Sequence, residues 1–186
     1  MDSWRAISDW LSPEVLSTAN VLIFSLFGPV GIDRGLALVF GLGLLILVPF
    51  ASTTLSYKKG KTTRDIERKD RFAIYESWLP YFLFGAFLFL IVGSHLLFVL
   101  AIGFAEVTAL LWFLNKFTKA SLHAGGVAGG VTPILFVFGW EWAWLYLLVA
   151  LVGFSRVKLK KHTVIQVVLG AVAGAFCTAL VYAVLL

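Results

Sequence analysis

Seven apolar runs, each near the length of a membrane-spanning helix, constrain the fold of this chain more than any other feature. A helix needs about 20 mostly apolar residues to cross the hydrocarbon core of a bilayer. The runs take up most of the 186 residues, of which 60% are hydrophobic and 13% charged. We therefore expect an all-α bundle of six to seven transmembrane spans, forming one membrane domain over 1–186. The runs cover 15–31, 35–56, 73–93, 95–115, 124–139, 140–155 and 162–186.

The segment before the first run is amphipathic. Trp4, Ile7 and Trp10 recur at helical spacing among polar residues, which predicts a short helix lying in the membrane interface. Ser12-Pro13-Glu14 then has the capping hydroxyl, the early proline and the acid of a helix start. No room is left for a soluble catalytic domain. Any chemistry must use loops and helix ends at the membrane surface, or polar side chains between helices.

Basic residues are concentrated in three connections between apolar runs. Two spans lie between each basic connection and the next, so we expect all three connections on one membrane face. By the positive-inside rule this face is cytoplasmic, in a prokaryotic plasma membrane. The net charge of +5 favours anionic lipid headgroups or a phosphorylated substrate as partners, and no nucleic acid is expected. The three groups are seven Lys and Arg within 57–71, then Lys116 and Lys119, then Arg156, Lys158, Lys160 and Lys161.

Two histidines stand beside these basic groups, each at the entrance to an apolar run. His162 begins a series that continues at every fourth residue with Gln166, Gly170 and Gly174, and His123 shares a helical face with Gly126 and Gly130. Glycines spaced by four let helix backbones approach closely in lipid. If the fifth and seventh runs pack through these glycines, the two histidines converge.

Two imidazoles, a hydroxyl and several cations on one face predict a phosphate site. Lysine and arginine neutralise phosphoryl oxygens. One neutral imidazole can attack phosphorus while the other, protonated, delivers a proton to the departing oxygen. Carboxylates do not cluster in the sequence, so neither a metal nor another cofactor is expected.

Three motifs in this order resemble the type 2 phosphatidic acid phosphatase superfamily, in a divergent prokaryotic branch. The third motif of that family is Ser-Arg, five residues, His, three residues, Asp; it is matched by Ser155-Arg156, His162 and Gln166. The second, Pro-Ser-Gly-His, is similar to Ala120-Ser121-Leu122-His123. The first pairs a lysine with an arginine seven residues on, as Lys61 and Arg68 do, and Arg64 with Arg71 is the alternative register. The resemblance covers 57–175; the interfacial helix and two additional helices of 1–56 precede it, and 176–186 complete the last helix.

The resemblance implies a role for each matched residue. His162 is the nucleophile, His123 the general acid, and Gln166 takes the place of the aspartate that orients the nucleophile. A glutamine carbonyl can hold the tautomer of the imidazole but supplies no charge. The phosphate ligands are Lys61, Arg68 or Arg71, Lys119, Ser121 and Arg156.

We therefore expect a metal-independent hydrolase of lipid metabolism that removes phosphate from a lipid phosphate or diphosphate through a phosphohistidine, with isoprenoid phosphates favoured. The alternative is an inactive phospholipid-binding or scaffolding protein in which Gln166 marks lost chemistry. A small transporter would instead use Glu106, in the middle of the fourth run. Lys158, Lys160 and Lys161 are interpreted as topology signals and His95 as structural.

Overall fold

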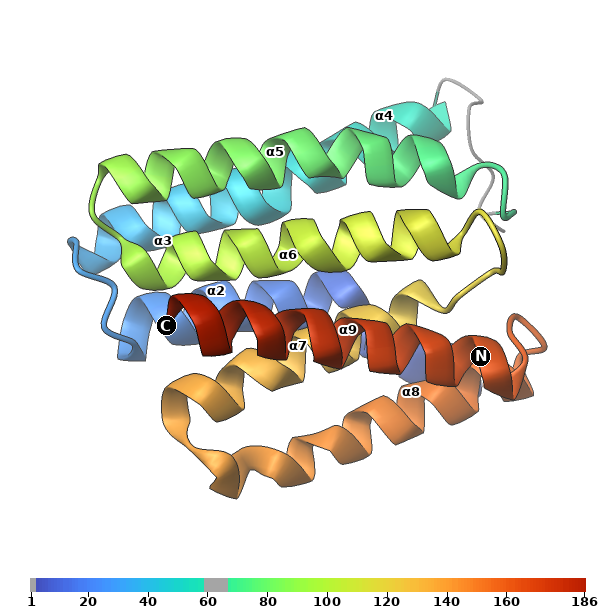
Figure 1. Ribbon diagram of the computed structural model, residues 1–186. Coiled ribbons are helices and arrows are strands. Elements are labelled where there is room, and N and C mark those ends of the chain that lie inside the picture. Colours follow the sequence, from blue (N-terminus) through green and yellow to red (C-terminus); the bar gives the residue numbers. More distant parts are fainter. Residues whose placement is uncertain (1–2, 59–66) are drawn as a thin grey trace.

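The computed structural model describes residues 3–58 and 67–186, and the described chain is helical throughout, with short connections (Figure 1). This confirms the all-α prediction. The first half contains α1 (Ser3–Trp10), α2 (Pro13–Phe27), α3 (Arg34–Leu42), the π-helix η1 (Gly43–Leu47), α4 (Val48–Lys58) and α5 (Arg71–Ile91). The second half contains α6 (His95–Leu114), α7 (Leu122–Phe138), the 3-10 helix η2 (Trp140–Leu145), α8 (Tyr146–Lys158) and α9 (Val164–Leu185).

Five helical stretches of the described chain are long and apolar enough to cross a membrane, which is consistent with an integral membrane protein. They are Ser3–Phe27, Arg34–Leu55, Arg71–Ile91, His95–Leu114 and Val164–Leu185. The expected six to seven spans exceed this number because the fifth and sixth runs form shorter helices. α7 has 17 residues and α8 has 13, since the Trp-rich turn between them is wound as η2.

Local signals in the sequence explain several helix ends. Ser12 caps α2, accepting a hydrogen bond from the Val15 amide, and Pro13 occupies the first turn, where a missing N–H costs nothing. α2 ends at Phe27, directly before Gly28-Pro29. The hydrophobic pattern predicted the helical segments, whereas these capping and breaking residues determined where α2 begins and ends.

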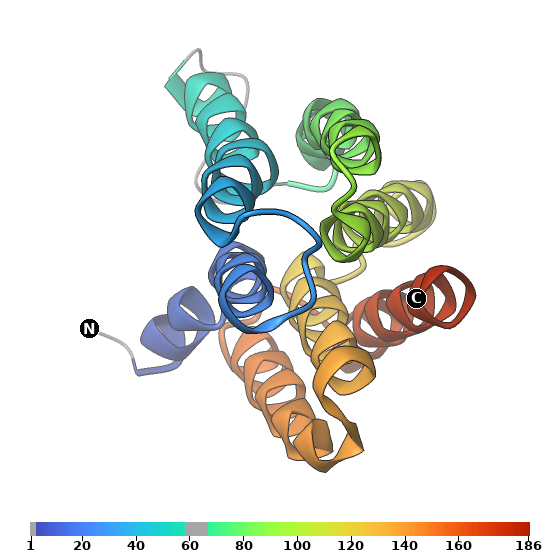
Figure 2. The same ribbon diagram turned by 90° about the vertical axis from the view of Figure 1, so that its left-hand side faces the viewer.

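α2 lies near the centre of the bundle when it is viewed along the helices (Figure 2). α7 packs most extensively against α9, through glycines on both helices. A Cβ at Gly170 would collide with the carbonyl oxygen of Ser121, and one at Gly174 with the carbonyl oxygen of Gly125. The close approach places the beginnings of α7 and α9 side by side.

The glycines that share a face with His123 pack elsewhere. A Cβ at Gly126 would meet Pro13, and one at Gly130 would meet Leu16, so this stripe faces α2. The close approach of α7 to α9 uses Gly125 instead, one residue away along the helix. The glycine spacing therefore indicated close helix contacts, and α7 makes them with two different neighbours.

Candidate functional site

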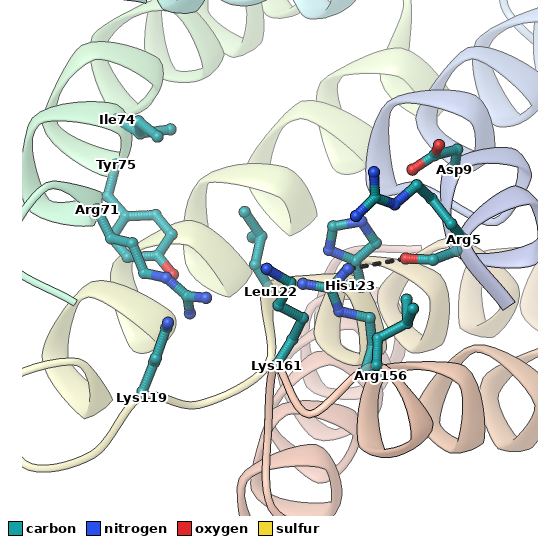
Figure 3. Close-up of a pocket in the computed structure, with 12 residues that line it drawn as sticks. Arg5, Asp9, Arg71, Ile74, Tyr75, Lys119, Leu122, His123, Arg156 and Lys161 are labelled. Atoms are coloured by element: carbon teal, nitrogen blue, oxygen red, sulfur yellow. Dashed lines mark hydrogen bonds between the residues drawn. The ribbon is translucent and has the colours of Figure 1, made fainter. Parts of the chain in front are cut away.

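A polar cavity of about 590 Å³ is lined by the side chains drawn in Figure 3. It lies at the end of the bundle where the ribbons of α5, α7 and α9 begin (Figure 1). Basic side chains from four separate parts of the chain face it, together with one histidine. The lining residues are Arg5, Ser8, Asp9, Arg71, Ile74, Tyr75, Lys119, Leu122, His123, Arg156, Leu159 and Lys161.

His162 is not among the residues that line this cavity, but it contacts two that are, and these hydrogen bonds define one tautomer of its ring. Nδ1 lies 3.0 Å from the main-chain oxygen of Lys119, and Nε2 lies 3.3 Å from Nη2 of Arg71. A carbonyl oxygen only accepts and a guanidinium only donates. Nδ1 therefore carries the proton and donates it to Lys119, while Nε2 presents a lone pair that accepts from Arg71.

The surroundings of His162 keep the imidazole neutral. Its side chain is buried, with 6% exposed. Burial, and then the positive charges of Arg71 and Arg156, lower the pKa of His162 from 6.5 to about 3, against a smaller opposing effect of the hydrogen bond to the Lys119 carbonyl. A neutral ring with an unprotonated Nε2 is the form in which a histidine acts as nucleophile.

Arg71 joins the two halves of the site. Its Nη1 donates to the carbonyl oxygen of Ala120 at 2.7 Å, while Nη2 contacts His162. The guanidinium is buried and lines the cavity. It therefore spans from the loop before α7 to the loop before α9, with its charge beside the Nε2 lone pair.

Arg156 is held from the opposite side by the N-terminal helix. Its Nη1 donates to Oγ of Ser8 at 2.8 Å (dashed in Figure 3). Ser8 is 1% exposed. Trp4, on the same helix, packs edge-on against Phe154 with ring centroids 5.1 Å apart. α1 is thus docked on α8 and forms one wall of the cavity.

Gln166 and Ser121 stabilise the loops instead of lining the cavity. Oε1 of Gln166 accepts from the Thr163 amide and Oγ1 of Thr163 accepts from the Gln166 amide, so the two residues form a capping box at the start of α9. Ser121 caps α7, and its amide donates to the Gln166 carbonyl oxygen at 2.9 Å. The orienting contact that the resemblance assigned to Gln166 is made by the Lys119 carbonyl.

The structure also separates the two registers of the first motif. Nε of Arg68 donates to the Asn115 carbonyl oxygen at 2.7 Å and its Nη2 donates to that of Lys116, so this side chain ties two loops together outside the cavity. Arg71 lines the cavity and contacts His162. Of the two arginines, Arg71 is therefore the one that faces the cavity. Lys61 and Arg64 lie outside the described residues.

Sequence reasoning missed Arg5, Ser8, Asp9 and Tyr75, and it interpreted Lys161 as a topology signal although this residue lines the cavity. A signal for Tyr75 was available, because it follows Arg71 by one helical turn. Arg5, Ser8 and Asp9 also share a helical face, but nothing in the sequence shows that this face docks beside the histidines.

Two other singled-out residues lie away from the cavity. Nε2 of His95, at the start of α6, is 2.6 Å from the carbonyl oxygen of Leu185, at the end of α9. Glu106 is exposed on α6. Within residues 3–58 and 67–186, no group of three or more His, Cys, Asp or Glu side chains is arranged to hold a metal ion.

Comparison of the chain with protein-family models, curated proteins and solved structures found no match. The functional argument therefore depends on the geometry of the cavity and on the motif spacing.

Proposed function

We propose that this protein is an integral-membrane lipid phosphatase, similar to the type 2 phosphatidic acid phosphatases, that forms a phosphohistidine on His162. The observation that carries this proposal is the neutral imidazole with Nδ1 bound to the Lys119 carbonyl and Nε2 beside Arg71. Arg71, Lys119 and Arg156 supply the positive charge that a phosphoryl group requires.

The first step begins when the phosphoryl oxygens draw Arg71 away from Nε2. Burial and the cations Arg156 and Arg71 disfavour a protonated His123 in the free site. The negative charge of the bound phosphoryl group offsets these cations, so His123 takes up a proton from solvent on binding. The Nε2 lone pair then attacks phosphorus, the bond from phosphorus to the leaving oxygen breaks, and His123 delivers its proton to that oxygen. In the second step water attacks the phosphohistidine and gives its proton to His123. The products are the lipid alcohol, or lipid monophosphate from a diphosphate, and inorganic phosphate.

An apolar groove supports a substrate with a hydrocarbon chain. It lies between α2, the η1–α4 segment and α5, and its walls include Leu45, Pro49, Trp78 and Phe82. Trp78 and Phe82 continue along α5 from Ile74 and Tyr75, which line the cavity. The groove has a volume of about 40 Å³, so it would accommodate only a short part of an isoprenoid or acyl chain whose headgroup lies in the cavity.

The proposal includes a topology. α7 and α8 also cross the membrane, with η2 and its tryptophans at one headgroup level, which makes seven spans with α2, the α3–α4 segment, α5, α6 and α9. The cavity then opens on the face that carries the basic clusters, and the positive-inside rule makes this face cytoplasmic.

The test is inorganic phosphate release by detergent-purified full-length protein from a panel of isoprenoid and glycerolipid phosphates and diphosphates, with EDTA present. We expect release by the wild type and loss of at least about 100-fold in H162A and H123A. H95A is the matched control, because His95 also hydrogen-bonds a main-chain carbonyl oxygen but is exposed and does not line the cavity. Size-exclusion profiles and circular dichroism verify that each variant is folded.

The outcomes separate the candidate functions. Loss of release in both cavity variants but not in H95A supports the phosphatase. Lipid phosphates that bind without being cleaved, with affinity dependent on Arg71, would support the inactive lipid-binding alternative. Transport of a solute that depends on Glu106 and not on the histidines, with no phosphate release, would support a transporter and overturn both other functions.

A further inference from the structure

The cavity carries more positive charge than one phosphoryl group needs. Arg5, Arg71, Lys119, Arg156 and Lys161 line it, whereas Asp9 is the single acidic residue among its lining side chains in the described part of the chain. A phosphate monoester carries a charge of about −1.5 to −2 at pH 7. Three cations already balance such a group, so two further cations face space beyond it.

The five cations divide into an inner and an outer group. Arg71 hydrogen-bonds His162, and the charges of Arg71, Arg156 and Lys119 all act on its ring, so these three form the inner group. Arg5 and Lys161 form the outer group. Figure 3 shows Arg5 on the opposite side of the labelled residues from Lys119, on the helix that also carries Asp9. A single phosphoryl group at His162 engages the inner group and leaves Arg5 facing the space beyond it.

The helix that carries Arg5 is firmly positioned. Ser8, three residues further along α1, accepts the hydrogen bond from Arg156, and Trp4 packs on Phe154. Side chains three residues apart share one helical face. Arg5 is therefore presented toward the cavity by a docked helix, and that helix lies before the 57–175 segment covered by the family resemblance.

We propose that Arg5 binds a second phosphoryl group, so that the preferred ligand of this site is a lipid diphosphate. This inference rests on the proposed function. The terminal phosphorus is transferred to Nε2 of His162, and the bond to the bridging oxygen breaks. That oxygen stays with the lipid monophosphate and takes the proton from His123, while Arg5 holds the remaining phosphate. A monophosphate substrate lacks the contact to Arg5.

The experiment measures binding of two small non-hydrolysable anions, methylenediphosphonate and methylphosphonate, to the full-length protein in detergent by isothermal titration calorimetry. The wild type is expected to bind the diphosphonate at least tenfold more tightly. R5Q is expected to lose about 10–100-fold in diphosphonate affinity, the effect of removing a charged hydrogen-bond donor, with little change for methylphosphonate. R5K, which keeps the charge, is expected to recover part of the loss.

The matched control is K158Q. Lys158 is an exposed cation at the same end of the bundle, with Nζ 5.1 Å from the ring centre of Phe154, and it does not line the cavity. Removing it tests whether general surface charge attracts the anion. Equal losses in K158Q and R5Q would overturn the assignment of Arg5.

The remaining outcomes keep this inference distinct from the proposed function. Equal wild-type affinity for the two anions, or an R5Q loss of the same size for both, would overturn the diphosphate inference and leave the phosphatase proposal intact. If the wild type binds neither anion, both proposals fail. Unfolding temperatures of the variants verify that a loss of affinity reflects the cavity and not the fold.

Discussion

Substituting Gly174 by alanine tests whether the contact between α7 and α9 builds the site. A Cβ at Gly174 would overlap the carbonyl oxygen of Gly125 and lie 2.8 Å from its carbonyl carbon, where ordinary contacts begin near 3.4 Å, so the helices must separate by more than about 0.6 Å. Overpacking costs about 1–3 kcal/mol, and an overlap with backbone lies in the upper part of that range, at about 2–3 kcal/mol. Alanine gains about 1 kcal/mol over glycine within a helix, so the free energy of unfolding should fall by about 1–2 kcal/mol.

G103A is the matched control for this substitution. Gly103 is buried within α6, but a Cβ there would meet only Tyr182 at 3.9 Å and Thr178 at 4.0 Å. The control should be neutral or up to about 1 kcal/mol more stable. The assay is unfolding of the detergent-solubilised protein in SDS, followed by tryptophan fluorescence.

The same displacement should also reach His162 and the loops beside the cavity. Separation of α9 from α7 stretches the 2.9 Å bond between the Ser121 amide and the Gln166 carbonyl, and the 3.0 Å bond between His162 and the Lys119 carbonyl. G174A should therefore lose phosphate affinity as well as stability. If G174A and G103A agree within 0.5 kcal/mol in stability and have the same phosphate affinity, the reasoning is refuted.

Three further predictions follow from the loops around the cavity. Q166A removes the capping box and should lower the free energy of unfolding by about 1 kcal/mol. It should reduce phosphate release far less than H162A does. A loss of release equal to that of H162A would show that the Gln166 side chain acts in the reaction. R71Q should weaken phosphate binding, measured by calorimetry, by about 10-fold or more, whereas R68Q should mainly lower the unfolding temperature. A larger loss of phosphate affinity in R68Q than in R71Q would instead assign Arg68 as the phosphate ligand. The pKa of His162 falls from 6.5 to about 3 on folding, so below pH 6.5 the unfolded chain binds a proton that the folded chain does not. The free energy of unfolding should therefore fall with decreasing pH by up to about 1.4 kcal/mol per pH unit. H162Q should show a shallower fall, and a pH profile identical to that of the wild type would contradict the neutral buried ring.

The sequence predicted the helical segments well because apolar runs and caps act locally. Ser12 caps α2 as its residue type indicates, whereas α2 ends at Phe27, before Gly28-Pro29 and within the expected run of 15–31. The glycine spacing predicted a close contact between the helices that carry the two histidines, but α7 makes it through Gly125 and not through the Gly126 and Gly130 that share a face with His123.

The rest of the site depends on contacts that residue spacing does not encode. Arg68 fits the motif by spacing, yet its side chain reaches the carbonyl oxygens of Asn115 and Lys116, which lie nearly fifty residues away. α1 meets α8 through Ser8 and Arg156, 148 residues apart. Neither pairing changes the local hydrophobic pattern, so neither leaves a trace in one sequence.

The contact that orients His162 also changes how substitutions in this loop should be interpreted. A main-chain oxygen is the same whatever side chain position 119 carries, so no ordinary substitution there deletes the acceptor. The side chain at position 166 is therefore not needed to orient His162, and it caps α9 instead. Over evolutionary time such a site can lose the acidic side chain of the motif while the imidazole of residue 162 keeps its orientation, because that orientation depends on the position of the 119–121 loop.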